Sequence, residues 1–145
     1  MAKRKHILLI VDDKEELGFF MDALKMIPGP IQCTYASSAE HAFEILTFVK
    51  PDFIFVDYHL PRINGLQFIS ILNLDSKLKE PKVFLYSTRI NVEIEKMGKI
   101  LGAAGSIKKT NSINTLIHQL KSILVPELLP RHVFLQQDEE RRYLN

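Results

Sequence analysis

Several polar side chains in this sequence stand at the ends of short segments that predict strands, and their types suit one kind of chemistry. They are Asp12, Asp13, Asp57, Ser87 and Lys109. Carboxylates placed together can hold a divalent cation, and a carboxylate can also act as a nucleophile toward phosphorus. A hydroxyl and an ammonium beside them can donate to an anionic group. The set therefore points to metal-assisted phosphoryl chemistry.

The charge balance of such a cluster supports this interpretation. Two carboxylates about 4 Å apart repel each other by roughly 4 kcal/mol at a surface-like dielectric. A site that brings Asp12, Asp13 and Asp57 together therefore needs a cation, and hard oxygen ligands suit Mg²⁺. Lys109 adds a fixed positive charge, and Ser87 adds a hydroxyl donor. Metal and lysine together would neutralise the charge that develops as a phosphoryl group transfers.

The elements that must position these residues alternate along the chain. Short segments that predict strands fall at residues 7–11, 31–35, 52–56, 83–86 and 106–108, and the first is a continuous apolar run typical of a strand buried on both faces. Amphipathic stretches that predict helices follow them at 14–26, 37–48, 66–72, 91–101 and 112–124. The second of these begins with a capping box formed by Ser37 and Glu40. Strands that alternate with helices predict a parallel sheet covered on both faces.

The predicted fold is α/β, a doubly wound five-stranded parallel sheet of the flavodoxin-like type, with strand order 2-1-3-4-5. Right-handed crossovers leave few other topologies. In such a fold, loops at the carboxyl ends of the strands form the site. Each candidate residue lies at one of these ends, so the sequence predicts that they share one crevice.

These residues and their flanking motifs resemble the receiver domains of two-component response regulators over about residues 5–124. The matching pieces are ILLIVDD (7–13), FIFVDYHLPRINGL (53–66), VFLYST (83–88) and LGAAGSIKK (101–109). The resemblance implies that Asp57 is the phosphoacceptor, and that Asp12, Asp13, Asp57 and the backbone carbonyl of His59 hold Mg²⁺. It also implies that Ser87 and Lys109 contact the phosphoryl group.

The sequence departs from the usual pattern of that family near the expected switch. Thr110 follows Lys109 where the family usually has proline, which leaves the isomer of that peptide bond open. Ser106 stands where the family often has an aromatic residue. We therefore assign switch or rim roles to a set of residues around the acceptor: Tyr86, Thr88, Arg89, Ser106 and Thr110, with His59 on the rim.

Three other functions compete with this one. A haloacid-dehalogenase-type phosphatase needs a second aspartate two positions after the nucleophile, and His59 stands there. A flavin-binding domain needs a phosphate-cradling loop after the first strand, where Asp12 and Asp13 would repel a phosphate. A degenerate receiver that acts only as a docking module remains the alternative, because Ser106 and Thr110 break the pattern.

Bulk properties set the remaining expectations. The 145 residues suit one domain, predicted at 1–125, with a tail at 126–145 that docks on it or binds a partner. A net charge of +2 gives no reason to expect nucleic acid, and we expect a cytoplasmic protein with no membrane insertion. The expected partners are a histidine kinase or histidine phosphotransfer protein and a downstream protein, with a homodimer left open. No separate enzyme domain is expected.

Overall fold

A computed structural model of the chain describes residues 3–129. Its strands are β1 (Lys5–Ile10), β2 (Ile31–Ala36), β3 (Phe53–Asp57), β4 (Lys82–Ser87) and β5 (Gly105–Lys108). Its α-helices are α1 (Lys14–Lys25), α2 (Ala39–Leu46), α3 (Gly65–Leu74), α4 (Val92–Leu101) and α5 (Ile113–Leu124), and short 3-10 turns span Ser76–Leu78 and Pro126–Leu128. No helix in the described part of the chain has the length and apolar character needed to cross a membrane.

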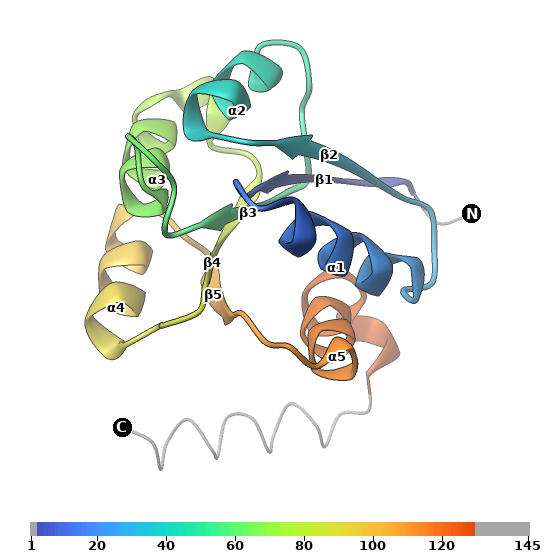
Figure 1. Ribbon diagram of the computed structural model, residues 1–145. Helices are drawn as coiled ribbons and strands as arrows, with labels where there is room; N and C mark the ends of the chain where they lie inside the picture. Colours follow the sequence, from blue (N-terminus) through green and yellow to red (C-terminus); the bar gives the residue numbers. More distant parts are fainter. Residues whose placement is uncertain (1–2, 130–145) are drawn as a thin grey trace.

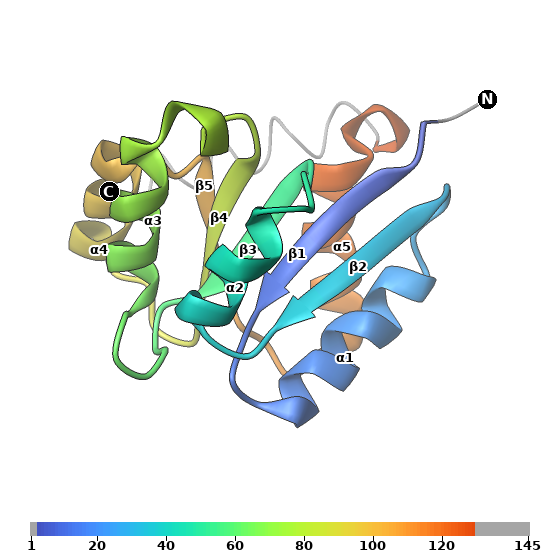
Figure 2. The ribbon, with the colours of Figure 1, turned by 90° about the horizontal axis from the view of Figure 1, so that it is seen from above.

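The strands form one parallel sheet in the order β2-β1-β3-β4-β5, which confirms the predicted fold. Helices α1 and α5 cover one face, and α2, α3 and α4 cover the other (Figures 1 and 2). All strands point the same way, so the residues at their carboxyl ends lie along one edge. The strand order makes β1 and β4 the two neighbours of β3, which places Asp57 at the centre of that edge.

The period-two alternation of the strands divides the core into two layers. Leu8 and Ile10 of β1 face the α2–α3 side, whereas Ile7 and Leu9 face the α1–α5 side. Both sets are fully buried. A strand covered on both faces reads as a continuous apolar run, which is why the sequence revealed the central strands so clearly.

Helix caps fix where the connecting loops end, and one expected cap was wrong. The N-cap of α2 is Ser38, whose side chain accepts a hydrogen bond from the His41 amide at 3.0 Å, so the predicted Ser37/Glu40 capping box does not form. Ser38 has the extended backbone that an N-cap requires, and its next turn places His41 rather than Glu40 at the bonding position. Glu40 instead pairs with Arg62 at 3.3 Å.

The chain after α5 is only partly described. Val125 is buried, and a 3-10 turn at Pro126–Leu128 follows it. Leu128 is largely exposed. Leu129 is half-buried. The other apolar residues expected to dock the tail, Val133, Phe134 and Leu135, lie outside the described residues, so docking of the tail stays a prediction.

Candidate functional site

Asp57 is the last residue of β3, the central strand of the sheet. Its carboxylate is buried between the carboxyl ends of the neighbouring strands. Asp57 is only 2% exposed. The backbone amide of His59 donates to Asp57 Oδ1 at 2.9 Å. The amide of Tyr58 donates to the carbonyl of Tyr86 at 3.2 Å, which ties the start of this loop to β4. The carboxylate is thus held by backbone that the sheet itself positions.

A glycine at the start of α3 brings that helix close to Asp57. A Cβ at Gly65 would lie 2.5 Å from the carbonyl oxygen of Asp57 and 2.9 Å from the Cα of Tyr58. The Gly65 amide donates to the Tyr58 carbonyl at 3.0 Å. Asn64 caps the helix and forms a reciprocal capping box with Gln67. Only a residue without a side chain fits this approach.

Lys109 closes the site from the end of β5. Its amide donates to the Ser87 carbonyl at 2.7 Å, which aligns the loop with β4. Its Nζ donates to Asp57 Oδ2 at 2.7 Å and to both carboxylate oxygens of Glu16 at 2.8 and 2.9 Å. Burial alone would lower the pKa of Lys109, but the hydrogen bonds and charges of Asp57 and Glu16 outweigh it and raise the pKa above its ordinary value. The side chain is therefore an ammonium at neutral pH.

Tyr86 forms the floor beneath this ion pair. It is buried, and its ring packs against Phe20 with the centroids 5.8 Å apart. Lys109 Nζ lies 5.3 Å from the centre of the Tyr86 ring. Burial, followed by the charges of Glu16 and Asp57, raises the pKa of Tyr86 to about 12. The phenol thus stays neutral and acts as an apolar support.

Ser87 lies at the carboxyl end of β4, but its hydroxyl is engaged elsewhere. It is fully buried, and its Oγ donates to the backbone carbonyl of Arg89 at 3.2 Å. Thr88 and Arg89 themselves are exposed. Ser87 therefore lies beside Asp57 at the carboxyl ends of β3 and β4, while its hydroxyl bonds within the β4–α4 loop.

The acidic pair after β1 is exposed, in contrast to Asp57. Asp13 is the N-cap of α1, and its Oδ1 accepts from the Glu15 amide at 2.8 Å. Within residues 3–129, no three acidic, histidine or cysteine side chains gather tightly enough to enclose a metal ion. The donors fit Mg²⁺ by type, because this ion takes one or two carboxylates directly and keeps several waters. The exposed pair leaves room for such waters.

The remaining predicted residues lie around this edge. The His59 side chain is exposed and its ring packs on Tyr58 with centroids 4.7 Å apart. Ser106 is half-buried in β5 opposite Leu85. The bond between Lys109 and Thr110 is trans, as no cis peptide occurs in the described chain, and Thr110 Oγ1 accepts from the Ser112 amide at 3.1 Å.

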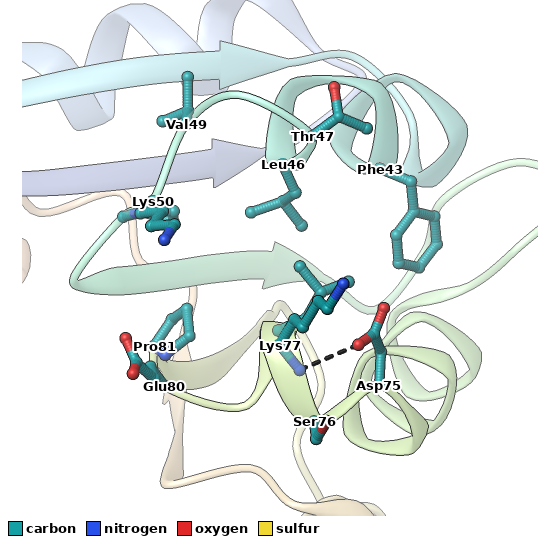
Figure 3. Close-up of a pocket in the computed structure, with 12 residues that line it drawn as sticks. Phe43, Leu46, Thr47, Val49, Lys50, Asp75, Ser76, Lys77, Glu80 and Pro81 are labelled. Atoms are coloured by element: carbon teal, nitrogen blue, oxygen red, sulfur yellow. Dashed lines mark hydrogen bonds between the residues drawn. The ribbon is translucent and has the colours of Figure 1, made fainter.

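An open hollow of about 370 Å³ adjoins the ion pair, and its lining includes Asp13, Glu16, Tyr86, Thr88 and Lys109. A second cavity of about 510 Å³ lies at the other end of the sheet, where the chain enters β3 and β4 (Figure 3). The lysine and acid side chains around it come from the α2–β3 and α3–β4 connections. The first hollow, and not the second, therefore lies beside the Lys109 side chain that bonds Asp57.

Sequence reasoning missed Glu16, which bonds Lys109 with both oxygens. The partners are 93 residues apart, so no local pattern reports the contact. One signal was available, because Glu16 follows the N-cap Asp13 by three residues and so stands in the first turn of α1. That turn faces the same hollow as Lys109.

The sheet order and the strand-end residues define a doubly wound α/β domain with a buried carboxylate and a lysine at the carboxyl ends of its strands. Residues 8–121 match the family model described as the response regulator receiver domain. The chain therefore belongs to the receiver domains of two-component signalling.

Individual relatives agree with this assignment. The phosphate regulon transcriptional regulatory protein PhoB of Pseudomonas aeruginosa is 26% identical over 117 residues, which cover 81% of this chain and 51% of PhoB. The chain thus spans about half the length of the curated relative it matches.

Solved structures of other response regulators share the fold, RcpA and Rcp1 among them. The phosphorylated cyanobacterial phytochrome response regulator RcpA has a TM-score of 0.74 at 24% identity, over 83% of this chain and 91% of RcpA. The Mn²⁺-bound response regulator Rcp1 has a TM-score of 0.73 at 19% identity, over 87% of this chain and 97% of Rcp1.

Proposed function

We propose that this protein accepts a phosphoryl group on Asp57 from a histidine kinase or a histidine phosphotransfer protein, and signals by protein–protein contact. The observation that carries the proposal is the buried Asp57 carboxylate, held at 2.9 Å by the His59 amide and at 2.7 Å by Lys109 Nζ. Both donors would also face an anionic group placed on that carboxylate. RcpA, which shares the fold, is described as phosphorylated.

In the proposed step, a carboxylate oxygen of Asp57 attacks the phosphorus of a phosphohistidine. The new P–O bond forms as the P–N bond breaks, and the electron pair of that bond leaves on the imidazole nitrogen. Lys109 neutralises negative charge on the transferring group, and the His59 amide keeps the carboxylate oriented. The chain thus promotes its own phosphorylation and, with water as the nucleophile, its own dephosphorylation.

Mg²⁺ would be held by Asp13 and Asp57 and by the backbone carbonyl of His59, with Asp12 acting partly through water. When bound, the ion would neutralise charge on the phosphoryl oxygens. Rcp1 is described as binding Mn²⁺, a divalent ion that also prefers oxygen ligands. Ser87 would supply a hydroxyl to one phosphoryl oxygen once its bond to Arg89 breaks.

Other parts of the proposal rest on the sequence. The receiver domain would span 1–125 and the tail 126–145 would dock on it or bind a partner. A cytoplasmic location and a homodimer also stay predictions. The alternative, a docking module without phosphorylation, remains because Ser106 and Thr110 depart from the family's usual residues.

Phosphorylation with acetyl phosphate and Mg²⁺, followed by intact-protein mass spectrometry, tests the proposal. We expect a mass gain of one phosphoryl group that disappears when Mg²⁺ is chelated. Asp57→Asn should abolish the gain, because it removes the nucleophilic oxygen while keeping nearly the same shape. Asp52→Asn is the matched control, as Asp52 is exposed just before β3. Undiminished labelling of Asp57→Asn, or no labelling of the wild type, would reject Asp57 as the acceptor.

A further inference from the structure

The Lys109 ammonium has no donor left for a new partner. An ammonium carries three N–H groups. In this structure the three acceptors are Asp57 Oδ2 at 2.7 Å and the two Glu16 oxygens at 2.8 and 2.9 Å. The Lys109 side chain is 12% exposed and that of Glu16 is 31% exposed, so water reaches the pair from the Glu16 side. The contact with Glu16 is thus the more open of the two.

Phosphorylation would unbalance this arrangement. A phosphoryl group brings about two negative charges and new acceptor oxygens to Asp57. Lys109 can contact one of those oxygens only by giving up a present acceptor. Glu16 is the candidate for release, because it is the more exposed partner and because its charge opposes that of the incoming group.

We propose that Glu16 competes with the phosphoryl group for Lys109, so that Glu16 weakens the affinity of the site for a phosphoryl-like anion and is released from Lys109 when Asp57 is modified. The inference rests on the proposed function. It makes Glu16 a positioning residue that acts through Lys109. Because Glu16 belongs to the first turn of α1, whose N-cap is Asp13, its release also links the charge on Asp57 to the start of that helix.

The competition is electrostatic as well as geometric. Glu16 and a phosphorylated Asp57 would share one lysine, and two anions at such short range repel strongly when water is partly excluded. The neutral amide of glutamine still offers one oxygen to Lys109 but carries no charge. Glu16→Gln therefore separates the charge of Glu16 from its hydrogen bond.

The test is a titration of the full chain with beryllofluoride and Mg²⁺, followed by amide NMR shifts. For Glu16→Gln we expect half-saturation at a concentration about three- to tenfold lower than for the wild type, and a smaller difference at about 0.5 M salt. Glu15→Gln is the matched control. It makes the same charge change one residue away on an exposed side chain, and we expect a shift of less than about twofold.

A second readout distinguishes this role from a structural one. Loss of the Glu16 charge and of one of its two acceptor oxygens should lower the melting temperature of Glu16→Gln slightly without any ligand, but a purely structural contact would not tighten anion binding. Equal affinity of Glu16→Gln and Glu15→Gln, or weaker binding by Glu16→Gln, would overturn the inference. A wild type that shows no Mg²⁺-dependent response would overturn the proposed function itself, and the inference with it.

Discussion

The two halves of the site differ in how far they are assembled. In one half, called here the assembled half, Lys109 already bonds the buried Asp57 at 2.7 Å. In the other half, called here the recruited half, Asp13 accepts a hydrogen bond at the start of α1 and Ser87 donates to the Arg89 carbonyl, so both side chains are engaged with backbone groups. The sheet alone places the residues of the assembled half, whereas the side chains of the recruited half would have to leave their present backbone partners to contact a ligand.

The assembled half is held by regular secondary structure, whose backbone is constrained by hydrogen bonds and close packing. β3 is paired on both sides and α3 begins in contact with its last residue. The other half depends on helix and loop ends, where a side chain can exchange a backbone partner for a ligand at modest cost. Variants in the two halves should therefore act on different quantities, stability in the first and ligand response in the second.

Of the variants considered, Gly65→Ala should cause the largest loss of stability, because it disturbs the assembled half of the site. Its Cβ would lie 2.5 Å from the Asp57 carbonyl oxygen, so backbone must shift, and we expect a loss of about 3 kcal/mol, the upper end of the overpacking range. Gly18→Ala is the matched control, because Gly18 lies inside α1 with nothing within 4 Å of a new Cβ. It should stabilise by about 0.5–1 kcal/mol.

Urea unfolding of both variants measures this difference. A nearly unchanged stability of Gly65→Ala would show that the start of α3 moves freely, and the contrast between the halves would then be unfounded. A stabilised Gly18→Ala also matters, since it shows that the assay reports helix propensity and not a general intolerance of alanine.

Asp13→Asn should act on the recruited half by weakening Mg²⁺ binding. Asparagine keeps the N-cap hydrogen bond of α1, so the variant removes charge and not the cap. We expect a loss of at least about tenfold in Mg²⁺ affinity by isothermal titration, because even an outer-shell partner of a metal ligand is worth about 10- to 100-fold. Asp22→Asn, exposed on the same helix, should change it little. Glu16 is unsuitable as a control, because it bonds Lys109.

An equal loss in Asp13→Asn and Asp22→Asn would indicate a nonspecific charge effect. It would place the ion away from Asp13, and the exposed acidic pair would then lose its assigned role. An unchanged affinity in both variants would likewise exclude Asp13 as a ligand.

The fold was predictable because its central strands are buried on both faces. The run at 7–11 is continuous and apolar, and its residues divide between two core layers. The ends of the elements were less certain, and α2 begins one residue later than the Ser37/Glu40 pattern indicated. Cap choice depends on the backbone angles of a single residue, which two adjacent serines do not distinguish by sequence.

The site was predictable where backbone topology determines it. Parallel strands bring their carboxyl ends together, so the positions of Asp57, Ser87 and Lys109 followed from the order of the elements. Side-chain partners did not follow. The bond between Ser87 and the Arg89 carbonyl, and the ion pair between Glu16 and Lys109, depend on rotamers and loop paths that no spacing encodes.

Among these variants, Ser87→Ala should change the stability least. It is also the sharpest test of the recruited half. To reach a phosphoryl oxygen, the Ser87 hydroxyl must leave the Arg89 carbonyl, which then loses a donor within the β4–α4 loop. The loop should rearrange in response, and the change should continue into α4. In the wild type, we therefore expect beryllofluoride with Mg²⁺ to perturb amide shifts throughout residues 86–101.

Ser87→Ala should uncouple the anion from that loop. Without the hydroxyl, the Arg89 carbonyl lacks its donor both before and after the anion binds, so the free and bound conformations of the loop differ less. A ligand shifts an equilibrium between two conformations only by its differential affinity for them. We expect the perturbation of residues 86–101 to fall by more than about half, while Asp57 and Lys109 still bind the anion. Ser106→Ala makes the same substitution in β5, opposite Leu85, and should leave the response nearly intact. If Ser106→Ala abolishes the response instead, or if residues 86–101 never respond, then the hydroxyl of Ser87 is not the link between the acceptor and the loop.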